Sequence, residues 1–267
     1  MNILSTVILG VVQGLTEFIP VSSSGHLVVI ENLLKGVSDP HLFIQSLSLG
    51  TTLALIIYFR KRILAIFRQV FINHDYRLLR DIVLTCIPVA TIGLLLADLI
   101  ETSSFASSSL VVAIAMASVG SLMIFLDKLP RLSPLTDGSK LNPLRAIWIG
   151  LAQCVALIPG ISRSGSTIIA AELMGLKPKP ATEYSFIVSI PVMIGLTGKL
   201  LISDLSFIAT NWSIILVGNI FAFIAGLIAI RYLLNYLSSH NLVIFGYYRL
   251  AAAGLIILLL TTNIIPK

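Results

Sequence analysis

Long apolar runs separated by short polar segments are the dominant pattern along the chain. Six of these runs come close to the roughly 20 residues that a helix needs to cross a bilayer. They predict membrane-spanning helices over residues 42–59, 82–100, 110–126, 182–201, 213–230 and 242–260. Of the 267 residues, 57% are hydrophobic and 11% charged, whereas soluble domains carry about 25% charged residues. The sequence therefore predicts an all-α polytopic membrane protein with six transmembrane helices.

Lysines and arginines gather between alternate spans, which predicts the orientation of the chain. The loops 60–81 and 127–145 are rich in them, whereas 101–109 and 202–212 contain none. Because cytoplasmic loops carry the excess of Lys and Arg, the first two loops are predicted to be cytoplasmic and the C-terminus to lie outside. Because the basic residues cluster in loops between the apolar runs, the net charge of +6 does not indicate nucleic acid as a partner.

Two further apolar segments, residues 3–34 and 146–176, are each interrupted by a proline and a Ser/Gly-rich break. At a constant offset of 140, residues 10–25 (GVVQGLTEFIPVSSSG) and 150–165 (GLAQCVALIPGISRSG) agree at five of sixteen positions. Chance similarity between two apolar stretches is the alternative explanation. We prefer an internal repeat because the sequence S-x-S-G follows a proline in both segments.

The two interrupted segments are predicted to be re-entrant helical hairpins. The orientation of the spans makes the first hairpin enter from outside and the second from inside. The chain is then a single membrane domain, 1–267, built from inverted-topology repeats of roughly 1–126 and 146–267, joined by 127–145. Non-helical backbone at membrane depth is tolerated only where protein or a water-filled cavity covers it. The two breaks are therefore predicted to meet near the midplane and to line one polar cavity.

The first break combines a carboxylate, a run of serines and a histidine. Gln13 and Glu17 are four residues apart and share one helical face; after a proline, Ser22–Gly25 begin the next helix and His26 falls in its first turn. A charge at membrane depth indicates a functional site, so Glu17 is a candidate metal ligand or base, and a protonated or surface-solvated Glu17 is the alternative. The helix start predicts an anion site with Ser23 as nucleophile or donor, although serines there are also ordinary caps.

The second break, PGISRSGST (159–167), places Arg163 at another predicted helix start. The positive end of the helix dipole disfavours a cation there, so an anion between the guanidinium and the backbone amides best explains it. The planar fork of arginine suits a phosphate. A structural pairing of Arg163 with Glu17 is the alternative. Together the two breaks predict a phosphate-binding pocket that is accessible from the lipid.

The sequences QGLTEFIPVSSSGH (13–26) and PGISRSGST (159–167) resemble the two motifs of the bacterial undecaprenyl-pyrophosphate phosphatase family, the bacitracin-resistance type. The resemblance covers essentially the whole chain. It implies an enzyme of the bacterial inner (plasma) membrane that removes one phosphate from undecaprenyl diphosphate and so recycles the lipid carrier for cell-wall synthesis. It also implies an active site that faces the periplasmic or outer side, and a divalent cation, Mg²⁺ or Ca²⁺, with Glu17 as its candidate ligand. Whether the protein is a homo-oligomer stays open.

Carried over by motif, the resemblance implies two sets of site residues. The catalytic candidates are Glu17, Ser23, His26 and Arg163. The candidates for substrate binding are Gln13, Ser22, Ser24, Gly25, Ser162, Ser164, Gly165 and Thr167. Many relatives have Glu where this chain has Gln13, and an amide cannot act as an acid, a base or an anionic ligand. Either that position is auxiliary, or Glu17 alone carries the metal or base role.

Several alternatives stay open at this point. A phosphoserine, a phosphohistidine and direct attack by water all fit the residues, and with a covalent serine His26 is the natural proton shuttle. A transporter or flippase of lipid phosphates or small anions would need the anion site but neither a nucleophile nor a metal. A lipid phosphatase of the acid-phosphatase type, with its SGH motif, would need a second histidine at membrane depth, and His240 lies beside a predicted loop.

Overall fold

Six long apolar helices form the framework of the molecule. A computed structural model describes residues 3–33, 39–96, 108–128, 135, 137–138 and 141–265. Within these ranges six helices are long and apolar enough to cross a membrane, and the described residues contain no strand beyond one isolated bridge. The prediction of an all-α polytopic membrane protein with six spans is confirmed. The six are α4 (Ser48–Phe71), preceded by the short α3 (Pro40–Ser46), α5 (Arg77–Leu95), α8 (Ser109–Leu126), α11 (Pro178–Ser203), α12 (Leu205–Tyr236) and α13 (Val243–Thr261).

The prediction of a loop over 60–81 is wrong in its extent, because most of that segment is helical. α4 continues to Phe71 and α5 begins at Arg77. Arginine and lysine are good helix formers, so the basic residues extend the two helices and leave only a short turn between them. The last four residues of the second predicted span, 97–100, and nine of the nineteen residues of the predicted loop 127–145 lie outside the described residues.

Two pairs of shorter helices occupy the positions of the predicted hairpins. The first pair is α1 (Ile3–Phe18) and α2 (Ser23–Leu33); the second is α9 (Pro143–Cys154), continued by the 3-10 turn η2 (Val155–Leu157), and α10 (Arg163–Leu173). At about 1.5 Å per residue none of these helices covers the roughly 30 Å of a hydrocarbon core. Each pair therefore has the helix–break–helix form that was predicted, and re-entry into the membrane stays a prediction.

The two pairs pack against long helices in the same manner. A Cβ atom at Gly10 of α1 would lie 2.3 Å from the carbonyl oxygen of Gly218 in α12. A Cβ atom at Gly150 of α9 would lie 2.4 Å from the carbonyl oxygen of Thr85 in α5. Glycine at these two positions, which the offset of the repeat relates to each other, allows the helix backbones to approach closely, as small residues do in membrane helices.

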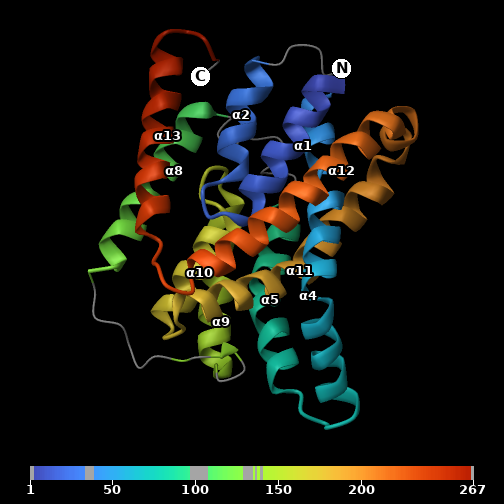
Figure 1. The fold of residues 1–267 in the computed structure, drawn as a ribbon, viewed down its shortest axis with the longest axis vertical. Coiled ribbons are helices and arrows are strands. Elements are labelled where there is room, and N and C mark those ends of the chain that lie inside the picture. Colours follow the sequence, from blue (N-terminus) through green and yellow to red (C-terminus); the bar gives the residue numbers. More distant parts are fainter. Residues whose placement is uncertain are drawn as a thin grey trace.

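The arrangement in Figure 1 places the breaks in the middle of the bundle. α13 packs along α8, and α12 crosses the bundle obliquely beside α1. The start of α1 and the end of α13 lie at one end of the molecule, whereas the turn between α4 and α5 lies at the opposite end. α1 and α2 extend from the break toward the first end, and α9 begins toward the second.

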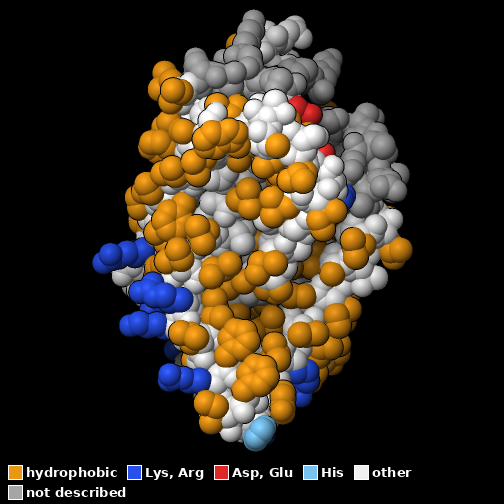
Figure 2. Space-filling view, turned by 90° about the vertical axis from the view of Figure 1, so that its right-hand side faces the viewer, with side chains coloured by type: hydrophobic (Ala, Val, Ile, Leu, Met, Phe, Trp, Pro, Cys, Tyr) orange, Lys and Arg blue, Asp and Glu red, His pale blue; other side chains and the backbone are white. Residues whose placement is uncertain are grey.

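Hydrophobic side chains cover most of the face in Figure 2, and lysines and arginines gather along the lower half of its outline. The lower end carries the turn between α4 and α5. This distribution fits the predicted cytoplasmic position of that turn.

Candidate active site

The end of α1 presents a carboxylate to the first break. α1 ends at Phe18, because Pro20 has no N–H to continue the helix and disfavours helical backbone at the residue before it. The side chains of Gln13 and Glu17 lie on one face, and Gln13 Nε2 donates a hydrogen bond of 3.1 Å to Glu17 Oε2. The prediction that these two residues share a helical face is confirmed.

Both breaks end in the same local structure. Ser22 and Ser162 precede α2 and α10, and their backbone φ angles are 74° and 75°, in a region that residues other than glycine rarely adopt. Each serine hydroxyl accepts from a backbone N–H three residues later, from Gly25 at 3.4 Å and from Gly165 at 3.1 Å. Both serines are therefore helix caps, and they occupy matching positions of the two repeated segments.

The second serine of each S-x-S-G sequence connects one break to the other. Ser24 Oγ accepts a hydrogen bond of 3.1 Å from the backbone N–H of Gly160, and Ser164 Oγ donates one of 3.4 Å to the backbone oxygen of Glu17. The prediction that the two breaks meet is confirmed for these residues. Ser24 and Ser164 thus connect the first break to the second by hydrogen bonds. They also contact Ser22 and Ser162, respectively, within their own breaks.

Glu17 is the centre of the contacts between charged and nucleophilic groups. Its Oε1 lies 2.6 Å from Nη2 of Arg163, and both side chains are 16% exposed. Its Oε2 accepts from Ser23 Oγ at 2.9 Å as well as from Gln13. The pairing of Arg163 with Glu17 that the sequence left as an alternative is therefore present. A carboxylate that already accepts the hydrogen of a serine hydroxyl is placed to take that proton.

His26 makes its hydrogen bonds to groups other than Ser23. Its Nδ1 lies 2.8 Å from the backbone oxygen of Ser22, and its Nε2 lies 2.6 Å from the hydroxyl oxygen of Tyr248. The rings of His26 and Tyr248 are stacked, with an interplanar angle of 9°. The hydroxyl of Ser23 instead bonds to Glu17.

Arg249 in α13 is the residue that sequence reasoning missed. Its side chain is fully buried and donates to four backbone oxygens in three parts of the chain. They belong to Met116 in α8 and to Pro20, Gly160 and Ile161 in the two breaks, at 2.6 to 3.2 Å. An arginine inside an apolar span is unusual, so the position of Arg249 within the predicted span 242–260 was the sequence signal that could have identified it.

Counting along α13 gives the position of Arg249 on this helix. Arg249 is the seventh of the 19 residues from Val243 to Thr261. With a rise of about 1.5 Å per residue, it lies about 9 Å from the first residue of the helix and about 18 Å from the last. The breaks that it contacts therefore lie beside the body of α13 rather than at its ends, and their position near the membrane midplane stays a prediction.

Thr167 is a predicted substrate-binding residue that contacts another helix away from the breaks. It is fully buried one turn into α10, and its hydroxyl bonds to the hydroxyl of Ser185 in α11 and to the backbone oxygen of Arg163. In this structure it ties α10 to α11.

Oxygen atoms at the first break fit a divalent cation that shares its ligands with a substrate. The described residues contain no group of three or more His, Cys, Asp or Glu side chains that would hold an ion by themselves. However, Oε1 of Gln13 is buried without a hydrogen-bond partner among the described residues, next to the carboxylate of Glu17. Mg²⁺ is commonly held by one or two carboxylates together with substrate phosphates and water. Gln13, Glu17 and Ser23 therefore suit an ion completed by phosphate oxygens.

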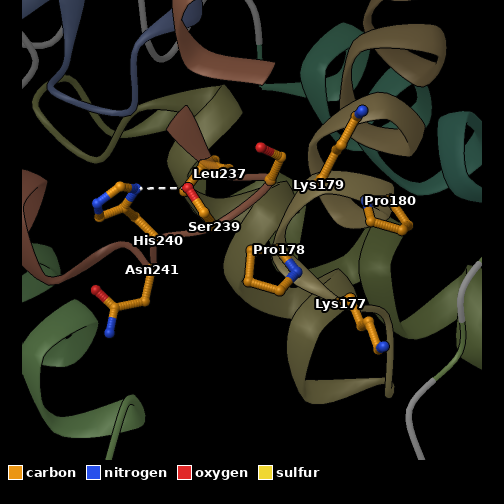
Figure 3. A pocket seen from close by; sticks show the side chains of 9 residues that line it. Lys177, Pro178, Lys179, Pro180, Leu237, Ser239, His240 and Asn241 are labelled. Atoms are coloured by element: carbon orange, nitrogen blue, oxygen red, sulfur yellow. Dashed lines mark hydrogen bonds between the residues drawn. The ribbon is translucent and has the colours of Figure 1, made fainter. Parts of the chain in front are cut away.

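A separate pocket of about 660 Å³ lies beyond the far end of α10, between the start of α11 and the turn from α12 to α13. Figure 3 shows Lys177, Lys179, Ser239 and His240 around it, with Ser239 hydrogen-bonded to His240. Both lysines and His240 are exposed. No residue of the two sequence motifs lines this pocket, so it is distinct from the site between the breaks.

The fold and this geometry define a polytopic helical membrane protein with a carboxylate, a serine and an arginine gathered between two helix starts. A model of the family described as bacitracin resistance protein BacA matches residues 6–255. The chain belongs to this family.

The chain is similar over nearly its whole length to proteins named undecaprenyl-diphosphatase. It is 37% identical to undecaprenyl-diphosphatase 1 of Clostridioides difficile, over 97% of this chain and 96% of that protein. The undecaprenyl-diphosphatase of Aquifex aeolicus is 39% identical, over 91% and 93% of the two chains. That of Neisseria meningitidis is 35% identical, over 96% and 95%. The resemblance given by the two motifs is confirmed.

Proposed function

We propose that the protein is an undecaprenyl-diphosphate phosphatase of the bacterial plasma membrane, which releases phosphate from a polyprenyl diphosphate and leaves the monophosphate. The observation that carries this proposal is the position of the Glu17 carboxylate, between the guanidinium of Arg163 and the hydroxyl of Ser23. This arrangement holds a phosphate clamp, a hydroxyl and a base within hydrogen-bond distance of one another. The names of the relatives support the choice of substrate.

The terminal phosphate binds where α2 and α10 begin. Backbone N–H groups and the positive ends of both helix dipoles favour an anion there. Arg163 exchanges its bond to Glu17 for a forked pair of bonds to phosphate oxygens. This exchange frees Oε1 of the carboxylate and replaces one anionic partner of the guanidinium by another.

Ser23 attacks and Glu17 accepts its proton. Ser23 Oγ forms a bond to the terminal phosphorus while the bond from this phosphorus to the bridging oxygen breaks, so the polyprenyl monophosphate leaves. Water then attacks the phosphorus of the phosphoserine while the bond from Ser23 Oγ to this phosphorus breaks, so inorganic phosphate leaves. His26 receives the proton of that water, and Glu17 returns its proton to Ser23 Oγ. Arg163 and the amides at the helix starts offset negative charge in both steps, as phosphoryl transfer requires.

A divalent cation, Mg²⁺ or Ca²⁺, would be held by Glu17 and by the unpartnered Oε1 of Gln13. When bound, it would supply a further positive charge beside the phosphates. The single carboxylate in this set makes the substrate phosphates a necessary part of its coordination.

The site opens toward the outer side of the membrane in this proposal, and the two halves of the chain are inverted repeats. Matching caps at Ser22 and Ser162 and matching glycine contacts at Gly10 and Gly150 support the repeat. The basic ends of α4 and α5 support a cytoplasmic position for the opposite end of the molecule.

The experiment that tests the function is phosphate release from a C55 polyprenyl diphosphate by the purified protein in detergent. Release is measured with and without Mg²⁺ or Ca²⁺ for the wild type, for Arg163→Ala and for Arg231→Ala, an exposed arginine of α12 that serves as the matched control. We expect cation-dependent release that Arg163→Ala abolishes and Arg231→Ala leaves intact. A folded wild-type protein that binds the lipid diphosphate without releasing phosphate would instead favour a transporter or flippase.

A further inference from the structure

The hydrogen bonds of His26 determine which of its nitrogen atoms carries a proton in the neutral ring. Nδ1 lies 2.8 Å from the backbone oxygen of Ser22. A carbonyl oxygen can only accept, so Nδ1 carries the hydrogen. Nε2 of the neutral ring therefore has the one free electron pair, and this is the atom that can take up a proton.

The hydroxyl of Tyr248 occupies that electron pair. Its oxygen lies 2.6 Å from Nε2 of His26, and the two rings lie nearly parallel with centroids 5.5 Å apart. A hydroxyl both donates and accepts. It donates to Nε2 while the imidazole is neutral, and it can accept from Nε2 once the imidazole is protonated. The same contact thus serves both states of the histidine.

The backbone of α13 fixes Tyr248 relative to the site. The next residue, Arg249, is fully buried and bonded to backbone oxygens of both breaks. Tyr248 itself is 48% exposed. Its hydroxyl is therefore held beside the histidine by the same helix that ties the breaks together, while the ring keeps a free side.

We propose that Tyr248 is a proton-relay and positioning residue that acts through His26. The attacking water gives its proton to the hydroxyl oxygen of Tyr248, and the hydroxyl proton moves to Nε2 of His26. The hydroxide formed from the water binds the phosphorus while the bond from Ser23 Oγ to the phosphorus breaks. The imidazole becomes imidazolium, and the tyrosine is unchanged overall. This inference rests on the role of His26 in the proposed phosphatase reaction.

Tyr248→Phe tests the relay because it removes the hydroxyl and keeps the ring that stacks on His26. Tyr247→Phe, at an exposed tyrosine in the same turn of α13, is the matched control. We expect Tyr248→Phe to lower kcat for phosphate release by about 10- to 100-fold, which corresponds to the loss of a hydrogen bond to a charged group. KM for the lipid diphosphate and the activity of Tyr247→Phe should stay at the wild-type values.

A double-mutant cycle and a spectrum separate the relay from a general structural effect. In the His26→Ala protein, Tyr248→Phe should change kcat by less than about twofold, because the residue through which it acts is gone. In ¹⁵N-histidine NMR spectra of the folded protein, the Nε2 signal of His26 is identified as the one that His26→Ala removes. Tyr248→Phe should shift this signal and leave the signals of the other histidines in place.

Two outcomes would overturn the relay. One is a Tyr248→Phe protein in which the Nε2 signal of His26 has shifted while kcat stays at the wild-type value. The other is an equal loss of kcat in the wild-type and His26→Ala backgrounds. A failure of the proposed function is distinguishable from both, since the wild type would then release no phosphate while the NMR signature of the hydrogen bond remained.

Discussion

Replacement of Arg249 by methionine should loosen the connection between the two breaks. The side chain is fully buried and donates to four backbone oxygens, of Met116, Pro20, Gly160 and Ile161. Methionine fills a similar volume and offers no donor, so these carbonyl groups lose their partner in the protein interior. Removal of one partner from a buried charged contact costs about 3–5 kcal/mol, part of which is recovered because the cation is no longer buried.

Thermal unfolding in detergent measures this loss. We expect the Tm of Arg249→Met to fall by roughly 5–15 °C. Arg249→Lys should lie between Arg249→Met and the wild type, because an ammonium group has three donors and cannot reproduce the fork of the guanidinium. Arg231→Met, at an exposed position of α12, should keep the wild-type Tm.

Phosphate release gives a second measure, because a small displacement of the breaks separates Glu17 from Ser23 and Arg163. Misplacement of catalytic groups by about 1 Å costs about 100-fold in rate, so Arg249→Met should lose at least that factor although Arg249 does not touch the substrate in our proposal. An Arg249→Met protein with the wild-type Tm and at least half the wild-type activity would refute this account of the residue.

Substitutions at three further positions test the site itself. Glu17→Gln removes the base and the partner of Arg163, and kcat for phosphate release should fall by on the order of 100-fold or more, in an assay where Tm shows that the protein remains folded. Gln13→Glu adds a second carboxylate beside Glu17, so the Mg²⁺ concentration for half-maximal activity should fall by about tenfold; an unchanged cation dependence would remove Gln13 from the metal site. Ser162 has a φ of 75°, so Ser162→Gly should be more stable than Ser162→Ala by about 1 kcal/mol, because glycine adopts this conformation without strain; equal Tm values for the two variants would contradict this.

The framework of the fold was predictable because it follows from local patterns. Apolar length alone identified the six spans, and Pro20 together with the S-x-S-G sequences identified the breaks. The constant offset between the two repeated segments also related Ser22 to Ser162, two positions that share an unusual backbone conformation. These signals depend on residues that are close in sequence, and the extent of α4 was mispredicted where charge, rather than helix propensity, was taken as the boundary.

The contacts made by α13 were not predictable in the same way. The bond between His26 and Tyr248 joins residues 222 positions apart, and Arg249 bonds to Pro20 across 229 positions. Apolar periodicity carries no information on such pairs. The sequence offered His26 as the proton shuttle for a covalent serine but gave no partner for its ring, which the folded chain turns toward Tyr248 in α13.

The two arginines solve two different problems that an interrupted helix creates inside a membrane. A break leaves carbonyl oxygens without donors on one side and N–H groups without acceptors on the other, and lipid can satisfy neither. Arg249 donates to the carbonyl oxygens of Pro20, Gly160 and Ile161, which leaves the helix starts free for an anion. In our proposal, Arg163 is then available to bind the phosphate. In the proposed site, Arg249 is therefore the cation that faces the backbone and Arg163 the cation that faces the substrate.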